Sequence, residues 1–264
     1  MKLRGLRVLA VASVPALVFA ACGDDDAGPA AAGPPAGKPT PEGDITVFAA
    51  ASLTDAFTEL GTAFEAENPE ASVEFNFGAS SALREQILAG APADVFASAN
   101  TSNMDEVVDG GAASDPEGFV TNQLEIAVPA GNEAGVTGLD HFANPDLLIG
   151  LCAEDVPCGE FGREALANAG VTPSIDTNEP DVRSLLTKVE AGDLDAGIVY
   201  VTDVMAAGDT VEGVEIPAEE NVVATYRIAA LTDAANPDAA DAFVQFVLSD
   251  EGQEILQSYG FGGP

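Results

Sequence analysis

The fold is decided by residues 45–64, which read ITVFAAASLTDAFTELGTAF. The first six residues are apolar or β-branched and predict a buried strand. From Leu53 onward, apolar side chains recur at helical spacing through Phe57, Leu60 and Phe64. A buried strand followed directly by an amphipathic helix is the repeating unit of α/β folds.

The same order of strand and helix recurs along the chain. Further strands are expected at residues 73–77, 94–99, 124–129, 147–151, 196–201 and 222–231. Further helices are expected at residues 83–88, 159–169, 182–189 and 242–256, the last one broken near Gly252. This alternation predicts an α/β fold with mostly parallel sheets. In such sheets, ligands bind beyond the carboxyl ends of the strands, where helices begin.

The N-terminal segment has the pattern of an export signal. Three basic residues precede apolar residues 8–21, which are too few for an ordinary membrane span. Residues 1–21 are therefore expected to be a signal peptide. Two alanines precede Cys22 and an acidic run follows it, a pattern that resembles a lipobox. We expect a lipid on Cys22 that anchors the protein to the outer face of the cell membrane; the alternative is cleavage near Ala21 and a free secreted or periplasmic protein.

Residues 22–43 are rich in Ala, Gly, Pro and Asp and nearly lack large apolar side chains. Such a segment cannot bury enough surface to order itself. After the lipid-bearing Cys22, it is expected to be a flexible linker between the membrane and the folded part. No later stretch is apolar and long enough to span a bilayer.

The chain is strongly acidic, with a formal net charge of −35. Without the expected signal peptide, six basic residues face 44 acidic ones, a net charge of −38. This excludes nucleic acid as a partner, because phosphate backbones need basic patches. A solvated acidic surface is the plain interpretation. It also opposes anion capture, unless short hydrogen bonds in a closed cleft outweigh a repulsion that salt screens beyond about 8 Å.

Two cysteines remain if Cys22 carries a lipid. Cys152 and Cys158 would then lie in an oxidising compartment, where a disulfide between them is expected; two free thiols are the alternative. Their spacing is not Cys-x-x-Cys and the chain has one His, so neither a redox motif nor a zinc site is predicted.

Four junctions between a strand and a helix carry small or polar residues. They contain Ser52, Ser80, Cys158 and the pair Asp181-Val182. Each serine could simply cap its helix. Helix N-termini, however, leave backbone N–H groups free and carry partial positive charge. Several of them converging on one point would form an anion site that needs no cation.

These junctions belong to an ordered set of motifs that resembles the periplasmic molybdate-binding proteins of ABC importers. The motifs are ITVFAAASLTDAF at 45–57, FGASSAL at 77–83, QI at 86–87 with GAPADVF at 90–96, DVR at 181–183, GIVY at 197–200 and SYGF at 258–261. The match runs in order from about Gly43 to the C-terminus.

The resemblance implies a two-lobed type II substrate-binding fold. Each lobe would be a mostly parallel sheet flanked by helices, and two crossover strands would join them. We expect lobe I to comprise residues 44–121 plus 224–264, and lobe II residues 122–223. The resemblance also implies a monomeric receptor without cofactor or enzymatic activity, which passes molybdate, and tungstate as well, to a permease with its ATPase.

The resemblance further implies which groups touch the oxyanion. They are the hydroxyl and N–H of Ser52 and of Ser80, the N–H groups of Cys158 and Val182, and the hydroxyl of Tyr200. These groups would contact the oxygens of the anion and would not ligate its metal atom. The family usually has a small residue such as Ala in place of Cys158, a change that a backbone donor tolerates.

Other interpretations stay open. A receptor of the same fold could bind sulfate, phosphate or ferric iron, although the three tyrosines lie far apart in the sequence, which argues against iron. Hydrogen phosphate carries a proton that a site made only of donors leaves unpaired, unless Asp55 or Asp181 enters the cleft. Arg84 and Arg183 are expected in ion pairs. A remote alternative is a secreted serine hydrolase that uses Ser80 and His141, but residues 78–82 lack the second glycine of a nucleophile elbow.

Overall fold

A computed structural model describes residues 41–264. The expected signal peptide, Cys22 and nearly all of the linker lie outside these residues, so those predictions stay open. Within the described part, no helix has the length and apolar character that a membrane crossing requires.

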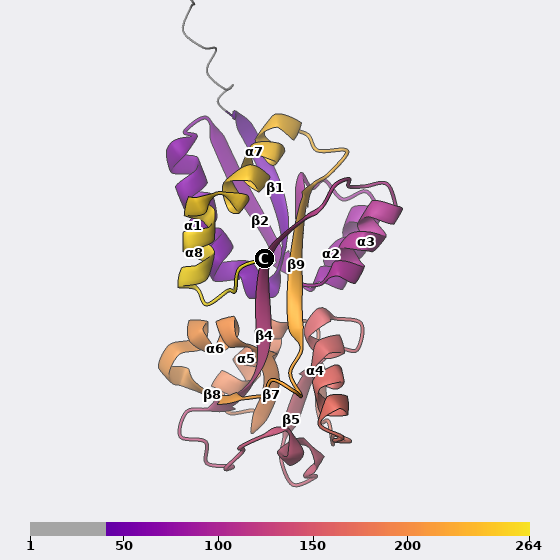
Figure 1. Cartoon of the computed structure of the whole chain (residues 1–264), viewed down its shortest axis with the longest axis vertical. Helices are drawn as coiled ribbons and strands as arrows, with labels where there is room; N and C mark the ends of the chain where they lie inside the picture. The colour runs from indigo at the N-terminus through magenta and orange to yellow at the C-terminus, as the bar shows by residue number, and fades with distance from the viewer. Residues whose placement is uncertain (1–40) are drawn as a thin grey trace, which may run out of the picture. The chain divides into compact units, whose positions relative to one another are not determined.

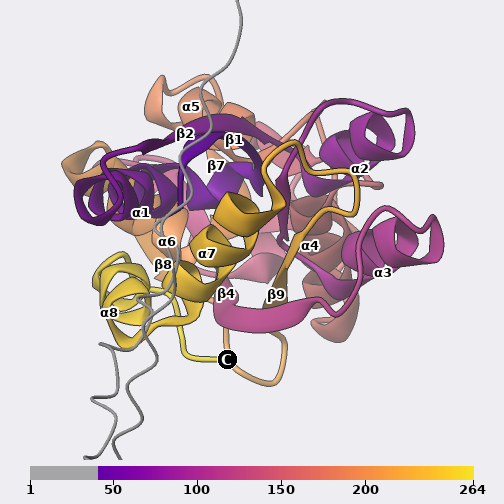
Figure 2. The same ribbon diagram turned by 90° about the horizontal axis from the view of Figure 1, so that it is seen from above.

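Lobe I, the upper part of Figure 1, is an α/β layer structure. Its strands are β1 (Gly43–Ala50), β2 (Ala71–Gly78) and β3 (Val95–Ser98). Its helices are α1 (Thr54–Glu67), with the 3-10 turn η1 (Ala51–Leu53) before it, α2 (Ser80–Leu88), α3 (Thr101–Asp109), α7 (Pro237–Leu248) and α8 (Asp250–Ser258). Seen from above, α1 and α8 lie to one side of the lobe and α2 and α3 to the other (Figure 2).

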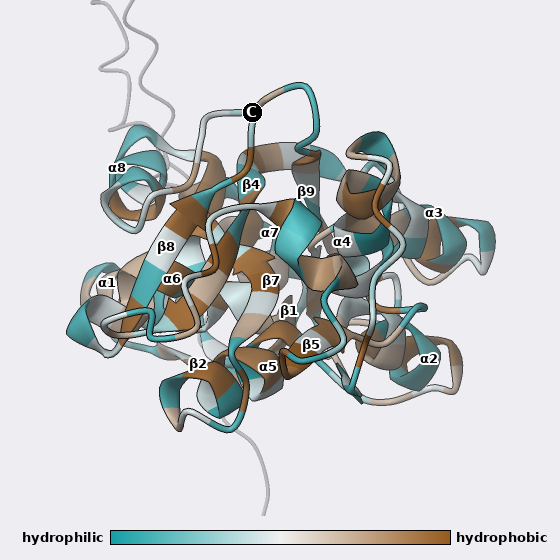
Figure 3. Cartoon of the chain, turned by 90° about the horizontal axis from the view of Figure 1, so that it is seen from below, coloured by the Kyte–Doolittle hydropathy of each residue, from teal (hydrophilic) through white to brown (hydrophobic). Residues whose placement is uncertain are grey.

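Lobe II repeats this plan on a smaller scale. Its strands are β5 (Ile149–Cys152), β6 (Thr177–Glu179), β7 (Ala196–Tyr200) and β8 (Val211–Glu215). Its helices are α4 (Pro157–Asn168), α5 (Val182–Glu190) and α6 (Val201–Ala207), with 3-10 turns η2 (Leu139–Ala143) and η3 (Gly208–Thr210). In Figure 3, β5 and β7 are hydrophobic, as expected for strands covered by helices.

Two long strands, β4 (Glu117–Pro129) and β9 (Val223–Ala230), join the lobes. The first half of β4, up to Gln123, pairs with β9, while the second half, from Leu124, pairs with β7 and β8. The strand order is β2-β1-β3-β9-β4-β7-β5-β6, with β8 beside β4. The pairs β2-β1-β3 and β7-β5-β6 are parallel, and β4, β8 and β9 make the antiparallel pairs.

The core of lobe I follows from the alternation of side chains along β1. Val47 and Ala49 face α1 and α7, whereas Phe48 faces α2 and α3. On the first face, Phe64 of α1 meets Phe243 of α7 edge-to-face, with ring centroids 5.3 Å apart. Such aromatic pairs add about 0.5–1.5 kcal/mol beyond the area they bury. This packing holds α1 and α7 against each other and against the sheet of lobe I.

The structure departs from the sequence-based elements in two ways. The final helical segment is broken close to Gly252, as expected, but three residues earlier, because Ser249 caps α8 by accepting a hydrogen bond from the Gly252 N–H at 3.1 Å. In addition, β4 begins seven residues earlier than the expected residue 124, and α3, α6, β6 and β8 were not expected.

Candidate functional site

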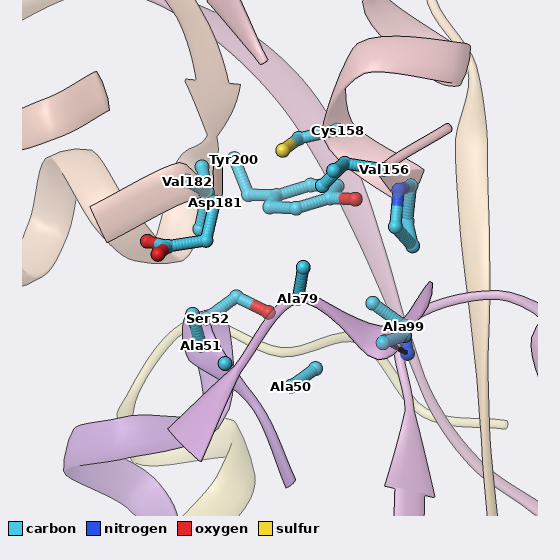
Figure 4. A pocket seen from close by; sticks show the side chains of 13 residues that line it. Ala50, Ala51, Ser52, Ala79, Ala99, Val156, Cys158, Asp181, Val182 and Tyr200 are labelled. Atoms are coloured by element: carbon cyan, nitrogen blue, oxygen red, sulfur yellow. Dashed lines mark hydrogen bonds between the residues drawn. The ribbon is translucent and has the colours of Figure 1, made fainter. Parts of the chain in front are cut away.

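A small cavity lies between the lobes, where strands end and helices begin. It bounds about 210 Å³, part of it open to solvent. Its lining residues are Ala50, Ala51, Ser52, Gly78, Ala79, Ser80, Ala99, Val156, Pro157, Cys158, Asp181, Val182 and Tyr200 (Figure 4). Its small size suits a single small ion and not a drug-sized ligand.

Ser52 lies in η1 with its side chain buried. Its Oγ is 2.8 Å from the phenol oxygen of Tyr226 on β9. The residue at the N-cap of α1 is Leu53, and no side chain caps η1 or α1. The interpretation of Ser52 as a helix cap is therefore wrong, because its hydroxyl bonds to a phenol from another element.

Ser80 is the first residue of α2 and is also buried. Its Oγ accepts a hydrogen bond from the N–H of Ala99, just beyond β3, at 3.0 Å. The N-cap of α2 is Ala79, and no side chain caps this helix. The capping interpretation is wrong here too. Both serine oxygens are held from behind by a neighbouring element.

Two helix starts in lobe II line the cavity. Cys158 is the second residue of α4 and Val182 the first residue of α5. The N–H groups of the first helical turn have no partner within the helix and carry partial positive charge. The N-cap of α5 is Asp181, whose carboxylate accepts from the N–H and the hydroxyl of Ser184, at 2.8 and 3.0 Å. In Figure 4 this carboxylate points away from the hydroxyls of Ser52 and Tyr200.

Tyr200 ends β7 and is 1% exposed. Burial raises the pKa of its phenol well above the ordinary value of 10, so the hydroxyl stays protonated. Within residues 41–264 this hydroxyl has no hydrogen-bond partner. Its ring lies across the cavity from Ser52 and Ala79 (Figure 4). Leaving a buried hydroxyl unpaired is unfavourable by about 1–3 kcal/mol, so the group is available to an acceptor in the cavity.

A charged network connects the lobes beside the cavity. The Arg183 guanidinium lies 2.5 Å from the Asp55 carboxylate on α1 and 3.1 Å from the buried Asp203 carboxylate on α6. Asp203 also accepts from the Tyr200 N–H at 3.1 Å. Burial raises the pKa of Asp203 to about 6, against the opposing effect of Arg183. Arg183 thus makes an ion pair between the lobes, and none of the Lys and Arg residues that the structure describes lines the cavity.

A disulfide joins Cys152, at the end of β5, to Cys158, with 5.7 Å between the Cα atoms. It ties the start of α4 to the neighbouring strand. The next residue, Gly159, packs so closely that an added Cβ would lie 1.8 Å from the carbonyl oxygen of Ala153. Only glycine fits there, so the backbone around the Cys158 N–H is tightly constrained.

Other chemistries find less support in the geometry. Within the described residues, no group of three or more His, Cys, Asp and Glu is placed to hold a metal ion. His141 lies in η2 and is not among the cavity residues, so it does not meet Ser80. Tyr200 and Tyr226 do lie side by side, with ring centroids 6.1 Å apart. Distance in the sequence was thus a poor argument against iron, although Tyr226 does not line the cavity.

The profile of one protein family, described as bacterial extracellular solute-binding protein, matches residues 45–262. The chain belongs to this family. Membership makes it an exported protein and agrees with a cavity enclosed between two lobes.

Individual relatives agree with the family. A protein of Mycobacterium tuberculosis named molybdate-binding protein ModA is 39% identical over 245 residues, 92% of each chain. Two solved structures share the fold. A periplasmic molybdate-binding protein of Azotobacter vinelandii has a TM-score of 0.73 at 17% identity and covers 83% of this chain and 99% of its own. The sulfate-binding protein SubI of M. tuberculosis has a TM-score of 0.75 at 18% identity, with 83% and 86% covered. The expected type II fold is confirmed.

The family's binding site is expected where the lobes meet, and there the structure brings together all five predicted residues. Ser52, Ser80, Cys158, Val182 and Tyr200 line one cavity. Contact between these residues and a ligand stays a prediction. Sequence reasoning missed Tyr226, which lies behind Ser52, because a partner 174 positions away leaves no local signal.

Proposed function

We propose that the chain is the extracytoplasmic receptor of an ABC importer. In this proposal it captures molybdate, and tungstate as well, between its lobes and delivers the anion to the permease with its ATPase. The observation that carries the proposal is a single small cavity lined by Ser52, Ser80, Cys158, Val182 and Tyr200 and by no Lys or Arg. Support comes from the relative named molybdate-binding, which matches nearly the whole chain.

The donor set suits a tetrahedral dianion. Hydrogen bonds to an ionised acceptor are about twice as strong as neutral ones. Free N–H groups at helix starts favour negative charge without the desolvation of a cationic side chain. Hydroxyls of Ser52, Ser80 and Tyr200 together with N–H groups of Cys158 and Val182 would surround the four oxygens. Tungstate has nearly the same size and charge, so we expect it to bind as well.

Closure of the lobes belongs to the proposal. We place the lobe limits at residues 44–121 plus 224–264 for lobe I and 122–223 for lobe II. These limits fall where Asn122 on β4 pairs with Ala224 on β9, so both crossovers would bend at the same level. Ion pairing of Arg183 with Asp55 would support the closed form.

We assign no enzymatic activity to the chain. Within residues 41–264, Ser80 Oγ bonds to the N–H of Ala99 and makes no hydrogen bond to a side chain that could act as a base. The receptor would act as a monomer and be held at the outer face of the membrane by lipid on Cys22. Sulfate is the second candidate ligand, because the sulfate-binding protein has the same fold and sulfate is also a fully deprotonated dianion.

Calorimetric titration of the mature chain, from Cys22 onward, tests the proposal. Molybdate and tungstate are expected to bind much more tightly than sulfate, and hydrogen phosphate most weakly. Sulfate binding as tightly as molybdate would transfer the function to the second candidate. Absence of binding to all four anions would remove the receptor function altogether.

A further inference from the structure

Beyond the groups that touch the anion, a buried hydrogen-bond chain lies behind the site. We propose that Tyr226 and Asn122 are positioning residues that orient the Ser52 hydroxyl, so that Ser52 donates its proton to the bound anion and the site discriminates against protonated oxyanions. This inference rests on the proposed function, because it concerns selectivity at the same cavity.

The donor-to-acceptor direction of this hydrogen-bond chain is set at Asn122 on β4. Its Oδ1 accepts from the Gln123 N–H at 2.9 Å, and a backbone N–H can only donate. The side-chain amide is therefore oriented with Nδ2 toward Thr202 Oγ1, at 2.9 Å, and toward the phenol oxygen of Tyr226, at 3.5 Å. An amide nitrogen can only donate. Asn122 thus offers Tyr226 no acceptor.

Tyr226 carries the same donor-to-acceptor direction toward Ser52. Its side chain is fully buried, and burial raises the pKa of its phenol far above the ordinary value, so the proton stays on the oxygen. Because Asn122 donates, the phenol proton is left for Ser52 Oγ, 2.8 Å away. Ser52 makes no other hydrogen bond among the described residues. Its oxygen accepts from Tyr226, and its own proton is free for an anion in the cavity.

Ser80 also accepts a hydrogen bond on its oxygen, but from a different kind of donor. Its Oγ accepts from the Ala99 N–H at 3.0 Å, so its proton is likewise free for the cavity. The donor behind Ser80 is a backbone group, which side-chain substitutions do not remove. The donor behind Ser52 is a side chain. Whether the Ser52 hydroxyl donates to the cavity or accepts from it therefore depends on the identities of residues 226 and 122.

Sulfate and hydrogen phosphate isolate the effect of a single proton. Both are tetrahedral dianions of similar size at mildly alkaline pH, but only hydrogen phosphate has a proton to donate. The Ser52 hydroxyl has one proton and two lone pairs, and one lone pair is taken by the phenol. To accept the phosphate proton with the other lone pair, Ser52 would have to turn its own proton away from the anion. The one carboxylate at the cavity, Asp181, accepts from Ser184 with both oxygens and points away from the hydroxyls of Ser52 and Tyr200. The ratio of phosphate affinity to sulfate affinity thus reports whether the Ser52 hydroxyl donates to the anion or accepts from it.

The first variant is Tyr226→Phe, which removes one buried oxygen and keeps the ring. Molybdate and sulfate affinities are expected to fall by about five- to tenfold, the size of one lost hydrogen bond. Phosphate affinity should fall less, because Ser52 can now turn and accept. The expected result is a phosphate-to-sulfate ratio at least about threefold above that of the wild type, measured by calorimetry at mildly alkaline pH.

The second variant, Asn122→Asp, reverses the chain. An ionised carboxylate can only accept, so the phenol would donate to residue 122 and Ser52 would donate to the phenol. Lone pairs of Ser52 would then face the anion. Added negative charge weakens both dianions alike and cancels in the ratio. We expect the phosphate-to-sulfate ratio to rise at least about thirtyfold, the size of a bond to a charged partner that is lost for sulfate.

The matched control is Tyr259→Phe. This tyrosine bonds to Glu59 at 2.6 Å on the exposed surface, away from the cavity residues. The Tyr259→Phe variant should leave every anion affinity and the phosphate-to-sulfate ratio unchanged. Thermal melting verifies that each variant is folded. A wild-type ratio in folded Tyr226→Phe would overturn the inference while leaving the receptor function intact. A raised phosphate-to-sulfate ratio in Tyr226→Phe together with a wild-type ratio in Asn122→Asp would show that Tyr226 positions Ser52 and that Asn122 does not. Failure of the wild type to bind any of these anions would instead refute the proposed function.

Discussion

The two walls of the cavity present hydrogen-bond donors in different ways. Lobe I offers the side-chain hydroxyls of Ser52 and Ser80, each held from behind by a bond to its oxygen. Lobe II lines the cavity with two helix starts, at Cys158 and Val182, and we expect their backbone N–H groups to be the donors; the first start is tied down by the disulfide. The lobe I wall therefore depends on residue identity, whereas the lobe II wall depends on backbone position.

The largest expected effect concerns the support of the lobe II wall by the buried carboxylate of Asp203. Its pKa in the folded protein is about 6, above the ordinary 3.8, so the folded state binds this proton more tightly than the unfolded state. The stabilisation is complete below the unfolded pKa and is lost as the pH rises through the folded pKa. Relative to Asp203→Asn, the free energy of unfolding of the wild type should fall by on the order of 3 kcal/mol between about pH 4 and 7.

Denaturant unfolding at several pH values measures this difference. Parallel pH profiles of wild type and Asp203→Asn would contradict it. The groups that face Asp203 are Arg183, the Tyr200 N–H and the more distant carboxylates of Asp55 and Asp181. None of these groups contacts the Ser52 or Ser80 hydroxyl of lobe I. A pH-dependent free energy of unfolding that disappears in Asp203→Asn would therefore assign the pH sensitivity to the lobe II wall.

The next effect tests whether lobe II binds through its backbone. Val182→Pro removes the N–H at the first position of α5, where proline is well tolerated, and the extended Asp181 before it suits a following proline. Molybdate affinity should fall by about 10- to 100-fold, as for a lost bond to a charged acceptor. Val182→Ala keeps the N–H and is the matched control. Equal affinity losses in both variants, measured by calorimetry, would show that the side chain matters and not the N–H.

The smallest effect tests the dependence of lobe I on its side chains. Ser80→Ala removes the hydroxyl and should weaken molybdate binding by about tenfold, at the lower end for a charged acceptor because the helix-start N–H at residue 80 remains. Ser81→Ala is the control, because Ser81 is equally buried yet does not line the cavity. Unchanged molybdate affinity in Ser80→Ala would remove the contrast between the walls.

The fold and the site differ in how far local sequence predicts them. The strand and helix of residues 45–64 were predictable because their apolar pattern is strong and local. Helix α3, with the sequence TSNMDEVVD, was missed because it buries only Asn103, Met104 and Val107. The final helix break was expected near Gly252 and lies three residues earlier, because the side-chain bond by which Ser249 caps α8 is visible only in the structure.

The five predicted site residues came from ordered motifs rather than from composition. The same motifs could not show what stands behind them. Ser52 has the residue type and position of a cap, and only the three-dimensional structure reveals its bond to Tyr226, 174 residues away. Likewise, Tyr200 and Tyr226 are distant in the chain and adjacent in space. Contacts set by tertiary packing leave no trace in a local window.

The absence of Lys and Arg from the cavity, in a chain of net charge −35, has a consequence for the speed of capture. A dianion that approaches such a surface is repelled, and dissolved salt screens this repulsion. The association rate should therefore rise with ionic strength, opposite to that of receptors that attract their ligands electrostatically. Tight binding would then have to come from slow release of the enclosed anion.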